Sequence, residues 1–533
     1  MHLPKNRNVL LVAPTLITEV PMTLAMLGAI FKQEGFSVST AVNTFRRPLS
    51  KDDFLAAARS CNAGIVGINM LTIDVLNIYE LVKMFKKEGC VVILGGPHPS
   101  SCPEEGIKYG ADIIVQNEGE ITVQELCRFW KNEGNTNIKD IKGITYRNSS
   151  GEIVSNFQRE RISDLGALPV PDVDIFNLDL FRTEDGLCKG VQRIFTSRGC
   201  PGICTFCSRK VFGQRIYYYP IPELVAEIQR RVDRFGITSF LIADDCFTTN
   251  KKYVYEFCNL VSQIKPKIVW RTSSRVNLVD ADMLKAMKEA GCHYIAFGLE
   301  SGDPETLRRI RKGIKMEDNI RIPHLAAEIG LQVFANMMIG FPWETEKSID
   351  NNIKYMHEIS DAVYLYQVAG AVTPFPGTEI YNEYSDEYDF KEYWLRPKHQ
   401  GVGIQIYQNS LTPYALSTYY QRNLFDDTVI QEDLFFSYSK EYKRKVSEFV
   451  FEIGKHNLQS LYPNEIWRRR AILTLSALSM CGYKLFPKFE KKLGNFLFKN
   501  KRSGAENIRD KKRGYVKSKE NVFVGSRQSL KKK

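Results

Sequence analysis

The sequence predicts an α/β protein in which a doubly wound domain precedes a partial (βα)6 barrel and a helical C-terminal region. Strand-like and helix-like segments alternate twice along the chain, over residues 8–140 and over about 190–395. The strands are short apolar runs of the kind that parallel sheets bury on both faces. The chain has 533 residues, which is too many for one compact core, so at least two domains are expected.

The first unit, residues 1–140, contains four predicted strands separated by helical segments such as Met22–Glu34. These strands are residues 8–13, 64–69, 91–96 and 112–116. Ligands of doubly wound sheets bind at the carboxyl ends of the strands. At those ends the sequence places Asn69–Thr72, Gly95–Ser100 and Glu118–Glu120.

A predicted hairpin and a proline-rich linker, residues 141–185, lead to the second unit, residues 186–395. Its six predicted strands are residues 193–197, 239–245, 267–271, 294–298, 332–340 and 362–367. Barrel chemistry sits at the carboxyl ends of strands, which here are rich in polar residues and glycine.

Cys200, Cys204 and Cys207 lie in the loop after the first barrel strand, at spacings of four and three positions. Thiolates hold iron–sulfur clusters, and three of them leave one iron of a cubane open. Pro201 and Gly202 favour an irregular loop over a helix. A zinc site is the alternative; it needs a fourth ligand, for which Cys188 is the nearby candidate.

This Cys-x-x-x-Cys-x-x-Cys pattern resembles the signature of the radical S-adenosylmethionine (SAM) superfamily. The resemblance implies a 4Fe–4S cluster on the three cysteines, with SAM chelated by the open iron. It also implies SAM contacts at the barrel strand ends, with Arg275 near the SAM carboxylate, Glu300 and Ser301 near the ribose or methionine, and the Gly340 loop near the adenine. The residues assigned to SAM are Phe206, Asp244, Arg275, Glu300, Ser301, Gly340 and Pro342.

The first unit resembles the cobalamin-binding domain that is fused to many radical SAM enzymes. The resemblance lies in Gly95-Gly-Pro-His-Pro99 and in the segment Gly110–Glu120, which ends in Asn-Glu-Gly-Glu. The glycine pair lets the backbone approach a flat macrocycle. The residues assigned to cobalamin are Asn69, Met70, Leu71, Thr72, Gly95, Gly96, His98, Glu118, Gly119 and Glu120.

The loop after the first strand departs from the pattern of related cobalamin proteins. Those proteins often carry a cobalt-ligating histidine there, whereas Pro14–Pro21 contains none. We expect cobalamin to bind without a histidine ligand; the alternative is that the domain has lost it. His98 is interpreted as a loop residue near the corrin edge.

The resemblance implies reductive cleavage of SAM, with methylation of an unactivated carbon or phosphorus of a small molecule or lipid as the leading reaction. A cobalamin-linked radical cyclase or rearrangement enzyme is the alternative enzyme. A non-catalytic cobalamin or redox sensor is the alternative from another class, and it would form no 5′-deoxyadenosine. The expected partner is a one-electron reductant such as flavodoxin or ferredoxin.

Residues 396–480 are predicted to be helical and aromatic-rich, and residues 481–533 form a basic tail with 17 Lys and Arg against 4 Asp and Glu. The tail is interpreted mainly as solvated and disordered. A basic then apolar segment, Trp467–Phe486, is a candidate for peripheral membrane contact. Nucleic acid is not expected as a partner. Twelve cysteines without a signal peptide lead us to expect a cytoplasmic protein, with the inner membrane face as the alternative.

Overall fold

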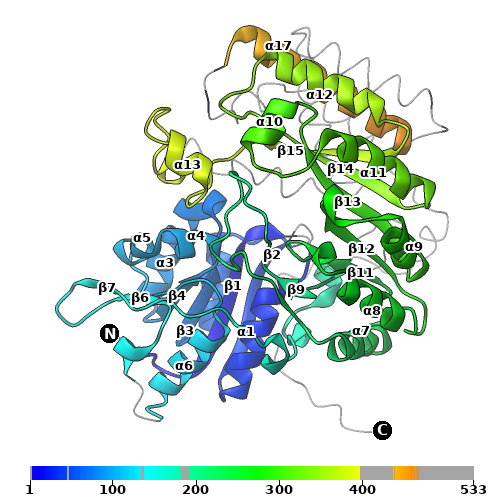
Figure 1. Ribbon diagram of the computed structural model, residues 1–533. Coiled ribbons are helices and arrows are strands. Elements are labelled where there is room, and N and C mark those ends of the chain that lie inside the picture. The colour runs from blue at the N-terminus through cyan, green and yellow to red at the C-terminus, as the bar shows by residue number, and fades with distance from the viewer. Residues whose placement is uncertain are drawn as a thin grey trace.

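The structure is a computed structural model that describes residues 3–396 and 436–466, except 18, 45–46, 134–136, 182–190, 437, 462–463 and 465. It contains two sheets, each accompanied by helices, that lie side by side and are drawn blue to cyan and green in Figure 1. Cys188, Tyr407 and most of the other predicted C-terminal aromatic residues lie outside the described residues, as do the segment Trp467–Phe486 and the basic tail.

The first sheet has seven strands in the order β2-β1-β3-β4-β5-β6-β7. Its strands are β1 (Asn8–Ile17), β2 (Ser37–Thr44), β3 (Ile65–Asn69), β4 (Val91–Gly95), β5 (Ile113–Val115), β6 (Ile144–Arg147) and β7 (Ile153–Ser155). The first five are parallel, whereas β6 and β7 are antiparallel. From β1 the chain proceeds to β2 on one side and then returns to β3 on the other side. The carboxyl ends of β1 and β3 therefore form the switch point at which doubly wound sheets bind ligands.

Helices cover both faces of this sheet, which confirms the doubly wound prediction. They are α1 (Met22–Gln33), α2 (Lys51–Ser60), α3 (Val75–Lys87), α4 (Pro97–Ser101), α5 (Pro103–Lys108) and α6 (Glu120–Trp130). Successive strand residues alternate between two cores: Val9 and Leu11 pack with α1 and α6, while Leu10 and Val12 pack with α2 and α3.

The second sheet has six parallel strands in the order β15-β14-β13-β12-β11-β8. They are β8 (Val191–Ile194), β11 (Ser239–Ile242), β12 (Val269–Ser274), β13 (Cys292–Glu300), β14 (Gln332–Ile339) and β15 (Val363–Ala371). Each predicted barrel strand is present, and the partial barrel is confirmed. Its helices are α7 (Ile221–Phe235), α8 (Lys251–Val261), α9 (Ala281–Glu289), α10 (Pro304–Arg309), α11 (Met316–Glu328) and α12 (Glu346–Glu358). The short helix α13 (Glu379–Tyr384) follows β15 and lies beside the first unit, whose core includes Ile380 (Figure 1).

A long helix near the end of the described chain, α17 (Lys440–Leu461), lies beside α12 (Figure 1). Tyr442, Phe449 and Ile453 are buried in the barrel core, so this helix is part of the second unit. The Asn457 amide exchanges two hydrogen bonds with the backbone of Tyr366 on β15. Among the described residues, no helix combines the length and apolar character needed to cross a membrane.

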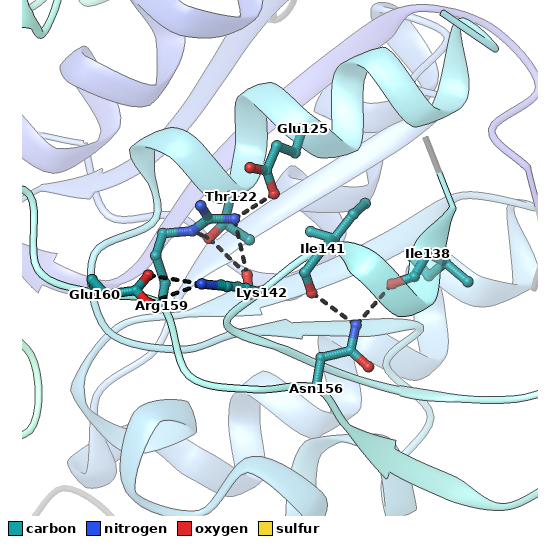
Figure 2. Close-up of polar contacts among 8 residues, drawn as sticks. All are labelled: Thr122, Glu125, Ile138, Ile141, Lys142, Asn156, Arg159 and Glu160. Carbon is teal, nitrogen blue, oxygen red and sulfur yellow. Dashed lines mark hydrogen bonds and ion pairs between the residues drawn. The ribbon is translucent and has the colours of Figure 1, made fainter. Parts of the chain in front are cut away.

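The segment between the two sheets is fixed to α6 by Arg159. Figure 2 shows its guanidinium donating to Thr122 Oγ1 and to the Lys142 carbonyl, and pairing with Glu125. Three residues later, the Ile162 N–H donates to the Glu118 carboxylate at 3.0 Å. The linker therefore supports the strand-end loop that precedes α6.

Candidate active site

The three cysteines of the signature lie in one irregular loop after β8 and the short strand β9 (Ser197–Arg198). The geometry around Gly202 tests whether this loop fits a cluster. A Cβ on Gly202 would lie 3.4 Å from Cys200 Sγ, 3.7 Å from Cys204 Sγ and 2.6 Å from Arg275 Nη1. A side chain at this position would clash with the Arg275 guanidinium and contact both thiols. Glycine therefore lets the loop bring two thiols and a positive charge together, and this donor set fits an iron–sulfur cluster.

A fourth cysteine, Cys246, lies beside the cluster loop and was missed from the sequence. It follows β11 and is 1% exposed. The interaction between the two thiols lowers the pKa of Cys200 and raises that of Cys246. The signal that could have found it is its place at the carboxyl end of a parallel strand, two residues after Asp244.

The two aspartates before Cys246 have different surroundings. Asp244 accepts hydrogen bonds from the Thr196 backbone N–H at 2.6 Å and from Ser197 Oγ at 2.7 Å, and it supports the start of the cluster loop. Burial raises the pKa of Asp244 to about 6 despite these bonds. Asp245 instead accepts a hydrogen bond from the Gly199 N–H and lines a cavity between the two sheets. The predicted SAM contact of Asp244 stays a prediction, since its oxygens already serve the loop.

Arg275 and Glu300 lie at neighbouring strand ends next to the cysteines. The Arg275 guanidinium is 3.7 Å from Cys204 Sγ, close enough to stabilise a thiolate. Glu300 has a φ of +64° and pairs with buried Lys312, Nζ to Oε1 2.5 Å. Ser301 donates to Asn352 Oδ1 and is fully buried. The structure thus places Arg275 against the cluster loop and links Glu300 to that loop through Lys312, while the Ser301 hydroxyl is engaged by Asn352.

The Gly340 loop is held in place by hydrogen bonds to the buried carboxylate of Glu344. Glu344 accepts from the backbone N–H of Gly340 at 2.7 Å and of Phe341 at 3.2 Å, and from the Tyr442 hydroxyl at 2.7 Å. Within the described part of the chain its Oε1 has no hydrogen-bond partner, and burial raises the pKa of Glu344 to about 7. Phe206 of the cluster loop packs edge-on against Phe341, so the two loops touch. Pro342, also assigned to SAM, lies within this same Gly340–Glu344 turn.

A cavity of about 710 Å³ lies between the two sheets and is bordered by both units. From the second unit it is lined by Cys200, Cys207 and Asp245. From the first unit it is lined by seven of the residues assigned to cobalamin: Asn69, Leu71, Gly95, Gly96, Glu118, Gly119 and Glu120. Two cluster cysteines and the carboxyl ends of β3, β4 and β5 therefore face one space.

The fit of this cavity to a flat macrocycle rests on the glycine pair after β4. Gly96 has a φ of +111°, and a Cβ there would lie 2.6 Å from Asn69 Oδ1 and 2.9 Å from the Met70 carbonyl oxygen. Gly96 is therefore required by its own backbone conformation and by close packing against the end of β3. Among the described residues, a Cβ on Gly95 would meet only the Val115 carbonyl, at 3.8 Å, so the strand end is open at Gly95, which lines the cavity and is compatible with a corrin.

The other three residues assigned to cobalamin are not among those lining the cavity. Met70 is fully buried in the core beneath the sheet edge. His98 belongs to α4 rather than a loop and is 1% exposed. Its Nδ1 lies 3.1 Å from Thr72 Oγ1 and its Nε2 lies 3.2 Å from Glu105 Oε1. His98 and Thr72 thus form part of a buried hydrogen-bond network, and their cobalamin contacts stay predictions.

The histidine-free loop after β1 reaches the barrel instead. Glu19, 6% exposed, pairs with Arg193 of β8, Oε2 to Nε 2.5 Å, and with Arg271 of β12, Oε1 to Nη2 3.3 Å. This loop, which has no histidine, therefore joins the two units through ion pairs. Nothing in its sequence marked Glu19 as different from a surface glutamate.

Two family models match the chain. One, described as the radical SAM superfamily, matches residues 194–356, and the other, described as a B12 binding domain, matches residues 9–127. Both ranges fall inside the predicted units, whose exact boundaries stay predictions.

Among curated relatives, an uncharacterized methyltransferase of Pyrococcus horikoshii is 31% identical over 369 residues, covering 68% of this chain and 78% of that protein. An anaerobic magnesium-protoporphyrin IX monomethyl ester cyclase of Rubrivivax gelatinosus is 24% identical, covering 70% of this chain and 68% of the cyclase.

Two solved structures share the fold. The radical SAM methyltransferase TsrM from Kitasatospora setae superposes with a TM-score of 0.60 at 19% identity, covering 72% of this chain and 76% of TsrM. The cobalamin-dependent SAM radical enzyme OxsB superposes with a TM-score of 0.66 at 16% identity, covering 95% and 83% of the two chains. Together with the two family matches and the shared cavity, the Pyrococcus relative shows that this chain belongs to the radical SAM enzymes with a B12-binding domain, whose cofactors are a 4Fe–4S cluster, SAM and cobalamin.

Proposed function

We propose that this enzyme methylates an unactivated carbon, or phosphorus, of a small molecule or lipid. The observation that carries the proposal is the single cavity lined by Cys200 and Cys207 on one side and by Asn69, Gly95 and Gly96 on the other. Methyl transfer between a cobalamin and a substrate radical requires both cofactors to face the same space. Most of the named relatives point the same way, including a hopanoid C-3 methylase and a cytidylyl-2-hydroxyethylphosphonate methyltransferase.

When bound, the cluster and SAM supply a radical that abstracts hydrogen, and cobalamin supplies a carrier for the methyl group. For methylation at carbon the reaction balances with two SAM molecules and two electrons per substrate. One SAM is reductively cleaved to methionine and 5′-deoxyadenosine, which takes the substrate hydrogen. The other gives its methyl group and leaves as S-adenosylhomocysteine. The electrons come from a one-electron reductant of the flavodoxin or ferredoxin class.

The residues of this chain position and shield these groups. Cys200, Cys204 and Cys207 hold the cluster, and Arg275 places a positive charge beside Cys204. Glu344 fixes the Gly340 turn that is assigned to SAM. The cluster loop also reaches the surface, where Ile203 is 48% exposed, which gives a reductant a short path to the cluster.

A radical cyclisation or rearrangement is the second candidate, and the cyclase relative favours it. Such a reaction consumes SAM only by reductive cleavage. The two reactions therefore differ in their products rather than in their cofactors.

The test is an anaerobic assay of the reconstituted protein with a chemical reductant, trideuteromethyl-SAM and a small-molecule and lipid extract. Methylation predicts S-adenosylhomocysteine and 5′-deoxyadenosine in about equal amounts, together with a product heavier by the labelled methyl group. Formation of 5′-deoxyadenosine without S-adenosylhomocysteine, and without label in any product, contradicts methylation and supports the cyclase-type reaction.

A further inference from the structure

We infer that Arg198 is a positioning residue that couples the two cofactor sites, so that cobalamin and the cluster bind with positive cooperativity. The inference rests on the presence of both cofactors and not on which reaction they perform. It is drawn from a buried ion triad that connects the cluster loop to a strand-end loop of the B12-binding domain.

The triad consists of one guanidinium from the barrel and two carboxylates from the first unit. Arg198 Nη1 lies 2.9 Å from Glu118 Oε1, and Nη2 lies 2.6 Å from Glu120 Oε1. The Tyr219 hydroxyl is 3.0 Å from the same Nη2. Arg198 is 8% exposed and each glutamate is 6% exposed, so water is a poor substitute for these partners.

On the cluster side, Arg198 is two residues from a cluster ligand. It ends β9, whose residues pair with Tyr217 and Tyr218 of the short strand β10 (Tyr217–Tyr218). The Cys200 N–H then donates to the Gly213 carbonyl at 3.2 Å. A shift of the Arg198 side chain is therefore transmitted along a short, hydrogen-bonded backbone to Cys200.

On the cobalamin side, the two glutamates flank Gly119 in the loop after β5. All three residues line the cavity. The two carboxylates accept hydrogen bonds from Arg198 and from the Ile162 N–H. The backbone of this loop, rather than these side chains, is therefore available to contact a corrin. The position of that backbone thus depends on where the barrel holds the Arg198 guanidinium.

The chemistry of the triad requires arginine. Its planar fork presents two nitrogens to two separate carboxylates, whereas a lysine ammonium is a single point charge. If the cluster fixes the cysteine loop, it fixes Arg198 and so preorganises the Asn117–Glu120 loop for cobalamin. By thermodynamic reciprocity, cobalamin must then strengthen cluster binding by the same factor.

The experiment measures the dissociation constant of hydroxocobalamin by anaerobic absorbance titration, with the cluster loaded and after its removal by chelation. For the natural chain we expect cluster loading to tighten cobalamin binding about tenfold, within the usual range of coupling between sites. For Arg198→Lys and Arg198→Gln we expect the ratio of the two constants to fall to within about twofold of one. The EPR signal of the reduced cluster, with and without cobalamin, gives a second readout that needs no activity.

Lys131→Gln is the matched control. The Lys131 side chain is 10% exposed and pairs with Glu34 at 2.8 Å, but this pair lies within the first unit and neither residue lines the cavity. The control should keep the tenfold ratio. If the Arg198 variants do not give folded protein, Glu120→Gln removes one arm of the triad and should reduce the ratio at least threefold. An unchanged ratio in a folded Arg198 or Glu120 variant, or a ratio of one in the natural chain, overturns the inference. A failed methylation assay would leave the ratio intact and overturn only the proposed reaction.

Discussion

The buried carboxylate of Glu344 gives a prediction about how stability depends on pH. Burial raises its pKa from 4.5 to about 7, so the folded protein holds this proton more tightly than the unfolded chain does. Between these two pKa values only the unfolded state loses the proton readily. Stability therefore falls as the pH rises from about 4.5 to about 7, and the loss is complete above that window.

The size of this effect follows from the two pKa values. A rise from 4.5 to about 7 corresponds to about 3 kcal/mol of lost stability at neutral pH. For a unit of this size, that is on the order of 10 °C in melting temperature. Glu344→Gln keeps one oxygen for the Gly340 and Phe341 N–H groups and for Tyr442, and it carries no charge.

The assay is thermal unfolding of the natural chain and Glu344→Gln at pH 5 to 8, followed by circular dichroism. The variant should melt close to the natural chain at pH 5 and several degrees above it at pH 8. Glu358→Gln, at the exposed end of helix α12, which follows Glu344 in the chain, is the control and should show no such trend. A melting difference between Glu344→Gln and the natural chain that is constant across this pH range would refute the reasoning.

Four further variants test individual parts of the site. Cys204→Ala should lower the iron content and abolish SAM cleavage, whereas Cys258→Ala, a buried cysteine in α8, should leave both unchanged; iron and activity retained in Cys204→Ala would refute the cluster assignment. Gly96→Ala should abolish cobalamin binding but not cluster assembly, because its Cβ would lie 2.6 Å from Asn69 Oδ1; cobalt bound at the natural level would count against the glycine argument. Cys246→Ser should still assemble a cluster but alter its EPR signal and reduction potential, since the polar neighbour that lowers the pKa of Cys200 is changed; loss of all iron would instead make Cys246 a ligand. Deletion of residues 481–533 should leave both cofactors bound, and unchanged liposome flotation would rule out a membrane role for the tail.

Much of the fold could be predicted because buried parallel strands are continuous apolar runs. The strand β2, Ser37–Thr44, was not predicted, because its sequence Ser-Val-Ser-Thr-Ala-Val-Asn-Thr is small and polar. It is an edge strand that pairs with β1 alone among the described strands. An edge strand is less enclosed than a central strand, so its sequence can be less apolar. The hairpin β6–β7 was predicted as part of a connector, but it extends the first sheet through antiparallel pairing of β6 with β5.

The candidate site was predictable where spacing along the chain carries the chemistry, as in the cysteine triplet and the glycine pair. It was not predictable where residues meet across the two units. Arg198 and Glu118 are separated by 80 positions, and Arg271 and Glu19 by 252. Neither pair leaves a periodic or local pattern, so only the docking of the two sheets reveals it.

The central claim is that cobalamin and the cluster occupy one shared cavity. The most direct measurement is the EPR spectrum of the reconstituted protein with the cluster reduced and cobalamin in its paramagnetic Co(II) form. A shared cavity predicts that each signal is broadened by the other and that the broadening disappears when either group is left out. Two independent, unbroadened signals at full occupancy of both sites would contradict the account.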